Sequence, residues 1–148
     1  MHRARAKLRP VLPQTLSDIR LEHQWENTLD GEKFLLIEDG TTRRILGSST
    51  IELLTALGGA DVVFMDNTFK IAPRVFTQLY TLHVFYRGQM VPCAFFLLAD
   101  KTQETDERML NLSGSCSESR GISFRPKAFQ IDFGDGVDDS HSASRLRN

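Results

Sequence analysis

Three apolar runs follow one another in the middle of the chain with short connections, and they constrain the fold more than any other feature. They read ADVVFMDNTFKI, FTQLYTLHVFYRG and MVPCAFFLLAD, and they are separated by residues 72–74 and 87–89. Runs rich in Val, Phe, Tyr and Thr are typical of β-strands, and connections this short join antiparallel neighbours. The third run is almost continuously apolar, as in a strand covered on both faces. The sequence therefore predicts a three-stranded antiparallel meander.

Helical signals flank this meander on both sides. Before it, SSTIELLTALGG has the Ser49–Glu52 spacing of a capping box and ends in Gly58-Gly59. That pattern predicts a helix over 50–57 with a left-handed glycine stop. After the meander, Thr102 is placed to cap a second helix with acidic residues in its first turn, and Ser113-Gly114 predicts its end.

Two more segments complete the predicted sheet. KFLLIEDG and TTRRIL meet at a turn signal and predict a hairpin on the rim of the domain, while KAFQIDF predicts a short strand after the second helix. A strand-helix-strand path returns the chain in the same direction, so the last strand is expected to lie parallel and adjacent to the first strand of the meander. The expected fold class is α/β.

The length of 148 residues favours one domain. We place a partly disordered N-terminal arm at 1–31, the domain at 32–133 and a disordered polar tail at 134–148. A net charge of -1 gives no overall basic field to attract nucleic acid, and only the segment MHRARAKLR is locally basic, as a solvated tail or a binding arm.

The cellular setting is expected to be intracellular, with the nucleus as one candidate compartment. Cys93 in a strand pattern and Cys116 in a Ser-rich loop suggest neither a disulfide framework nor a metal motif. No signal peptide is visible, and no apolar stretch approaches the roughly 20 residues that cross a bilayer. We expect no membrane association and no small-molecule cofactor.

Two acids stand out because each lies near the end of an apolar strand pattern. They are Asp66 in VVFMDNTFK and Asp132 in KAFQIDF. If the two strands are parallel neighbours, the acids lie side by side, and two carboxylates at that spacing repel unless a cation neutralises them. Oxygen ligands of this kind suit Mg²⁺ or Mn²⁺. Acids at strand ends also form turns or cap helices, so both interpretations stay open.

The segment from Phe64 to Leu110, together with PKAFQIDF, resembles the transposase domain of Mutator-like elements, the MULE family. The resemblance covers roughly residues 34–135. It is carried by these features: Asp66 with TFK, the strand start QLYT, Val91-Pro92, Lys101-Thr102 with Glu104-Thr105, and Ile131-Asp132-Phe133. It implies a ribonuclease-H-like fold and a DDE-type site in which two aspartates and a later glutamate bind divalent metals for DNA strand cleavage. Asp66 matches the first acid and Asp132 the second.

The sequence also departs from the family pattern. Asn67 stands where a small residue is usual, Gly134-Asp135-Gly136 stands where a helix should begin, and no glutamate follows Glu118, so the third acid is absent. The expected fold is therefore a partial ribonuclease-H-like fold, incomplete at the C-terminus. The expected function is an inactive transposon-derived remnant with residual metal or DNA binding. Two alternatives remain: an active nuclease subunit completed by another chain, and a structural module whose unfinished sheet is covered by a protein partner.

Three basic or titratable residues near these acids have two interpretations each. Lys70 and Arg74 follow Asp66 and are candidates for contacts with DNA phosphate, or they are solvated charges at a strand end. His83 lies within the second apolar run and is interpreted as a packed sheet residue rather than a catalytic one.

Overall fold

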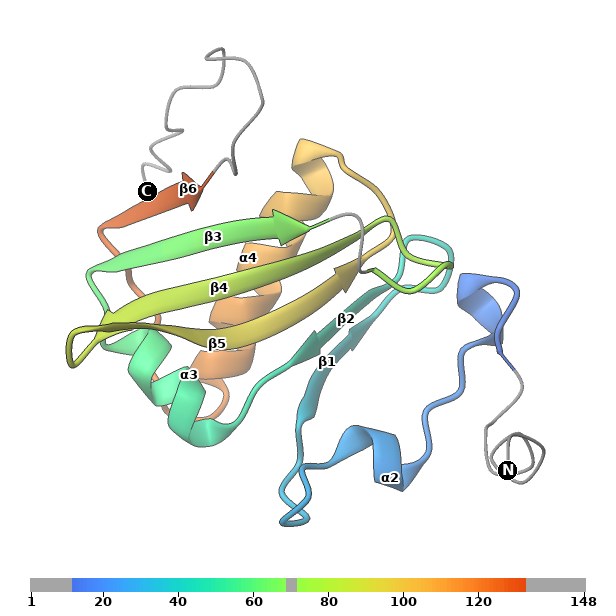
Figure 1. The fold of residues 1–148 in the computed structure, drawn as a ribbon, viewed down its shortest axis with the longest axis horizontal. Coiled ribbons are helices and arrows are strands. Elements are labelled where there is room, and N and C mark those ends of the chain that lie inside the picture. The colour runs from blue at the N-terminus through green and yellow to red at the C-terminus, as the bar shows by residue number, and fades with distance from the viewer. Residues whose placement is uncertain (1–11, 69–71, 133–148) are drawn as a thin grey trace, which may run out of the picture.

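The fold is seen in a computed structural model that describes residues 12–68 and 72–132 (Figure 1). Its elements in chain order are a 3-10 turn (Leu16–Asp18), α2 (His23–Glu26), β1 (Leu35–Asp39), β2 (Ile45–Ser48), α3 (Ile51–Gly58), β3 (Val62–Thr68), β4 (Gln78–Tyr86), β5 (Gln89–Leu98), α4 (Gln103–Glu118) and β6 (Ala128–Asp132).

All six strands belong to one mixed sheet in the order β1-β2-β5-β4-β3-β6. β3, β4 and β5 form the predicted antiparallel meander, and β1 and β2 form the predicted hairpin, which joins the sheet through β5. α4 connects β5 to β6, and β6 pairs parallel with β3. The predicted α/β class and the parallel placement of the last strand are therefore confirmed.

The main core lies between one face of the sheet and the helices α3 and α4 (Figure 1). Leu57 of α3 and Met109 of α4 are fully buried against Val63 and Leu82 of the sheet. Burying a side chain of this size stabilises the fold by about 1.5–3 kcal/mol. This packing fixes α4 across the sheet, and so fixes where the chain enters β6.

The start of α4 agrees with the sequence, but its end does not. The Thr102 hydroxyl accepts a hydrogen bond from the Thr105 N–H at 3.3 Å, as predicted for an N-cap. The predicted end at Ser113-Gly114 is wrong, because the helix continues to Glu118.

Tertiary packing explains this continuation of α4. Ser113 and Cys116 are buried against the core, and the Ser113 hydroxyl donates to the Met109 carbonyl at 2.8 Å, so it is satisfied inside the helix. Burial of this face outweighs the low helix propensity of Ser and Gly. Cys116 is therefore a buried helical residue and not part of a loop, and both cysteines are free thiols.

α3 forms as predicted, with its cap displaced by one residue. Thr50, not Ser49, is the N-cap and accepts a hydrogen bond from the Leu53 N–H at 3.2 Å. The buried Ser49 hydroxyl donates instead to the Cys93 carbonyl at 2.6 Å. This bond ties the beginning of α3 to β5.

The predicted left-handed stop of α3 is also wrong. Gly59 has a φ of -82° and is right-handed. Gly58 has a different requirement, since a Cβ there would lie 2.4 Å from the Ser123 carbonyl oxygen. Close approach of the segment that leads to β6, rather than backbone conformation, favours glycine at this position.

The described part of the predicted N-terminal arm packs on the rim hairpin. Arg44 is buried, forms an ion pair with Glu38, and donates to the carbonyls of Leu16 and Ile19 at 3.1 and 3.0 Å. Ile19 is itself buried in a second apolar cluster beside Leu35, Leu46 and Phe76. A buried guanidinium is stable only when hydrogen-bonded, so Arg44 holds this stretch in place.

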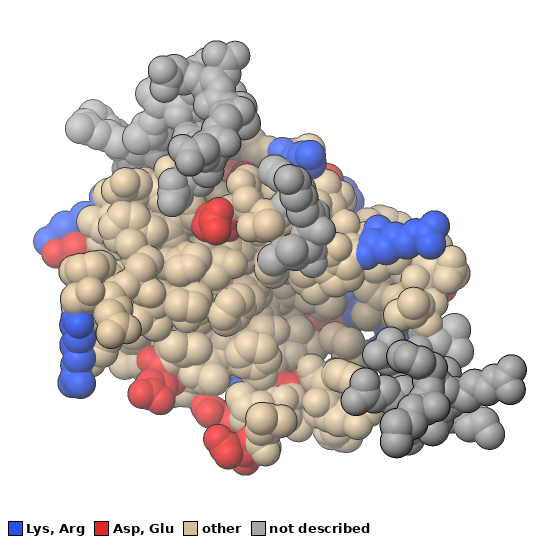
Figure 2. All heavy atoms as spheres, in the orientation of Figure 1, with Lys and Arg blue, Asp and Glu red and all other residues tan. Residues whose placement is uncertain are grey.

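The opposite face of β3, β4 and β5 carries none of the helices in the described chain (Figure 1). Figure 2 shows this face as largely uncharged surface, with acidic and basic side chains gathered mainly at its margins. Phe85 at the end of β4 is 64% exposed.

Candidate functional site

Strand alternation explains the acid within the apolar β3 run. Val63 and Met65 point to the helices and are buried, whereas Asp66 is on the opposite face and is exposed. Within residues 12–68 and 72–132, no Lys or Arg forms an ion pair with Asp66. The side chain of Asp66 is therefore on the exposed face of β3, so an acid in this apolar run does not bury its charge.

Asp66 and Asp132 are directly opposite each other in the sheet. The parallel register pairs Val62 with Ala128 and continues without interruption to Asp66 with Asp132. For Asp132 the structure describes the backbone. The backbone lies beside that of Asp66, toward the carboxyl ends of two neighbouring strands. Paired carboxylates at one strand end are suitable oxygen ligands for Mg²⁺ or Mn²⁺.

The predicted basic residues are only partly described. Arg74 is exposed in the connection between β3 and β4, at the end of the sheet where Asp66 lies. Lys70 lies outside the described residues. His83 is half-buried and pairs with Phe64 of β3 and Pro92 of β5, in the middle of the sheet.

A third acid, Asp106 in the first turn of α4, lies on the helix-covered side of the sheet, whereas Asp66 is on the opposite face. Tyr80 is almost fully buried, and its pKa is raised by burial and by the negative charges of Asp106 and Asp66. Both acids are therefore close enough to influence the Tyr80 hydroxyl electrostatically. Tyr80 pairs with Asn67 of β3 in the sheet. Sequence reasoning assigned the acids of this turn to the helix dipole and so missed Asp106.

Asp106 is an unusual carboxyl because it is half-buried and its Oδ1 has no hydrogen-bond partner in the described protein. Burial first, and the charge of Asp100 second, raise its pKa to about 6. A signal for this was present in the sequence: Asp106 precedes Met109 and Ser113 by three and seven residues, which is the spacing of one helix face.

Asp100 has the opposite electrostatic setting. Burial would raise its pKa, but hydrogen bonds from Thr105, Thr102 and Arg43 outweigh that effect and lower the pKa to about 2. Arg43 Nε donates to Asp100 Oδ2 at 3.2 Å, and the Thr102 hydroxyl donates to Oδ1 at 2.8 Å. Asp100 is thus a structural anchor between the hairpin turn and the start of α4.

The metal interpretation rests on backbone register rather than on an assembled ligand set. Over the described ranges, no three His, Cys, Asp or Glu side chains are grouped closely enough to hold a metal ion. Asp66 and Asp132 are the residues that could hold one, through carboxylate oxygens.

Comparison with known proteins gives no relative for this chain: no family model, no curated protein and no solved structure matches it. None of the helices among the described residues is long and apolar enough to span a membrane.

Proposed function

We propose that this chain is a transposon-derived domain of the MULE transposase type, without DNA-cleaving activity, that retains a divalent-cation site at Asp66 and Asp132. The observation that carries the proposal is the β3–β6 register, which pairs these two acids on adjacent parallel strands. The meander, the crossover helix α4 and the parallel β6 support a ribonuclease-H-like arrangement within this proposal.

The chemistry expected of such a site is binding without turnover. A cation between the two carboxylates relieves their mutual repulsion and leaves coordination positions for a phosphate oxygen. Arg74 and Lys70 follow Asp66 in the chain and are the proposed contacts to DNA phosphate. Of the three acids of a DDE site, this sequence supplies counterparts of two, Asp66 and Asp132, and we propose the function that two carboxylates support, which is binding.

Thermal unfolding in Mg²⁺ or Mn²⁺ tests the cation site. For a dissociation constant of about 1 mM, about 10 mM cation stabilises the folded state by about 1.4 kcal/mol. That corresponds to a rise in Tm of roughly 3–6 °C for a domain of this size. Asp66→Asn and Asp132→Asn should each remove the rise. Asp61→Asn is the matched control, since Asp61 precedes β3 and pairs with Lys127 at 3.1 Å. No stabilisation, or equal stabilisation in all variants, would reject the cation site.

One observation favours the alternative of an active subunit completed by another chain: β6 lies at the edge of the sheet, where a further strand can be added. A supercoiled-plasmid nicking assay with Mn²⁺ distinguishes the two functions. The proposed remnant leaves the plasmid intact, whereas cleavage that is abolished by Asp66→Ala would establish an active nuclease.

A further inference from the structure

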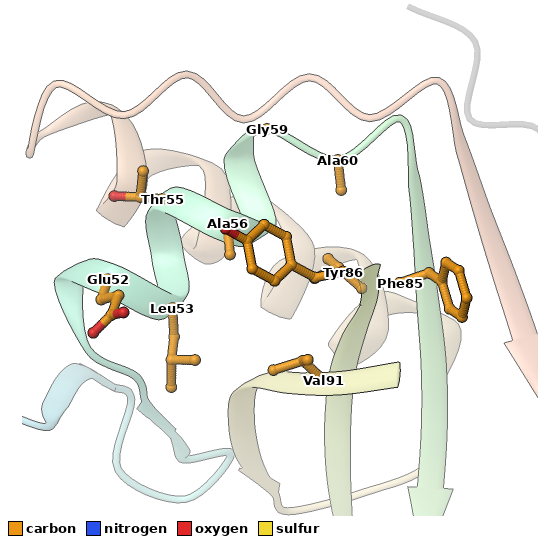
Figure 3. Close-up of a pocket in the computed structure, with 10 residues that line it drawn as sticks. Glu52, Leu53, Thr55, Ala56, Gly59, Ala60, Phe85, Tyr86 and Val91 are labelled. Carbon is orange, nitrogen blue, oxygen red and sulfur yellow. The ribbon is translucent and has the colours of Figure 1, made fainter. Parts of the chain in front are cut away.

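A groove of about 660 Å³ lies between α3 and the tip of the β4–β5 hairpin (Figure 3). Leu53 and Ala56 of α3 form one wall, and Tyr86 and Val91 of the hairpin form the other, with the Tyr86 ring directed toward Ala56. Its volume falls within the range of about 300–1,000 Å³ of ligand sites. The proposed cation site does not use this groove.

The apolar residues at the hairpin tip are far more exposed than those of the core. Tyr86 is 50% exposed, Phe85 64% and Met90 47%. Phe85 and Met90 are cross-strand partners, so their side chains share one face of the hairpin tip, and in Figure 3 the Phe85 ring is directed away from Tyr86. Exposed apolar side chains gathered at one hairpin tip indicate an interaction site more often than singly scattered ones do.

The charges around the groove determine which partner fits it. Glu52 lines the groove from the first turn of α3, is exposed, and forms no ion pair with any described residue. The guanidinium of Arg87 stacks on the Tyr86 ring, 5.2 Å from its centroid, and supports the opposite wall. Figure 2 shows acidic side chains along the margin of the molecule beside α3, and basic side chains further along the same margin toward the hairpin tip. An occupant with an apolar anchor and an adjacent positive charge matches these features.

The structure points to a peptide-binding groove: we propose that it takes a segment of a partner protein with a large apolar side chain flanked by Lys or Arg. The apolar side chain fills the space between Ala56 and Tyr86, and the basic side chain pairs with Glu52. The groove is bordered by exposed side chains of the hairpin tip and is not an enclosed cavity, which favours a chain segment over a small molecule.

Selection from a phage-displayed library of random dodecapeptides tests this proposal with the full chain. Enriched peptides should share an aromatic or Leu residue next to Lys or Arg. In fluorescence anisotropy, Glu52→Lys should weaken binding of an enriched peptide about tenfold, since one such pair is worth on the order of 1.4 kcal/mol when partly desolvated. Tyr86→Ser should weaken it at least as much. Glu118→Lys, the same charge change at the end of α4, should leave binding unchanged.

Circular dichroism of each variant establishes that it is folded, and both key positions are exposed enough to be replaced without loss of the core. The proposal is wrong if no shared motif is enriched, if enriched peptides lack a basic residue, or if Glu52→Lys binds as tightly as the original chain. Sedimentation that shows a dimer abolished by Tyr86→Ser would assign the groove to a second copy of the chain and equally overturn it.

Discussion

Replacing Asp106 by Asn should stabilise the protein at neutral pH, although it removes an acid from the first turn of a helix. The carboxyl is half-buried, its Oδ1 has no hydrogen-bond partner in the described chain, and burial raises its pKa to about 6 from 3.8. The ionised form is therefore less favourable in the folded protein than in the unfolded one. This raised pKa makes the folded state lose stability as the pH rises from about 4 to about 6, and the loss is complete above that range.

Two opposing effects determine how much Asp106→Asn changes the free energy of unfolding. A difference between about 6 and 3.8 corresponds to at most about 3 kcal/mol, at 1.36 kcal/mol per pH unit. Partial exposure of the carboxyl screens this interaction and reduces it to about 1.5–2 kcal/mol. The favourable effect of an acid on the α4 dipole, about 0.5 kcal/mol, acts in the other direction. We therefore expect Asp106→Asn to raise the free energy of unfolding by about 1 kcal/mol at pH 7.5.

Urea unfolding followed by circular dichroism between pH 4 and pH 8 measures this effect. The advantage of Asp106→Asn should be present at pH 7.5 and should disappear as the pH falls toward 4. Glu107→Gln is the control for removal of a charge from α4, because Glu107 is exposed and accepts a hydrogen bond from Gln103 that glutamine can also accept. An Asn variant that is less stable at pH 7.5, or whose advantage is independent of pH, would refute the reasoning.

Two further substitutions test packing around the hairpin. Gly47→Ala should destabilise the fold by about 1–3 kcal/mol in urea unfolding, because a Cβ there would lie 2.6 Å from the Phe96 ring and 3.0 Å from the Ile37 Cβ. An unchanged urea midpoint would show that the Phe96 ring moves aside freely. Arg44→Met should release the stretch around Leu16, because it removes the hydrogen bonds from Arg44 to the carbonyls of that stretch. Limited trypsin digestion should then cut at Arg20 faster than in the original chain. Equal cutting rates would show that apolar packing alone holds this stretch.

The elements that the sequence predicted correctly are those with short-range causes. The β4–β5 turn at Arg87-Gly88 has positive φ at both residues, as a tight hairpin requires, and glycine at the second position indicates it in the sequence. The Thr102 cap depends on a hydrogen bond only three residues away. The parallel placement of β6 is the exception, because it is a long-range pairing that followed from the topology of a strand-helix-strand path, and it brings Asp66 and Asp132 into register.

The errors have long-range causes. α4 continues past Ser113 because that face is buried by strands distant in sequence, and Gly58 is constrained by a carbonyl 65 residues further along the chain, at Ser123. Asp106 was missed for a related reason. Local sequence places it correctly in a first helical turn, but only the packing of α4 on the sheet buries one of its oxygens and brings it near Tyr80. Propensity contains no information about either effect.

The proposed cation site and the proposed peptide groove lie at opposite ends of the same strands. The groove residue nearest to Asp66 in the sheet is Val84 of β4, three residues from Thr81, which pairs with Asp66. At about 3.3 Å per residue this separates them by about 10 Å along the strand, more than the Debye length of about 8 Å at physiological salt. A cation beside Asp66 should therefore leave peptide affinity nearly unchanged, and Glu52→Lys should leave the Mg²⁺ stabilisation intact. Loss of both peptide binding and Mg²⁺ stabilisation in Glu52→Lys would indicate that the sheet, and not the individual site, had been disturbed.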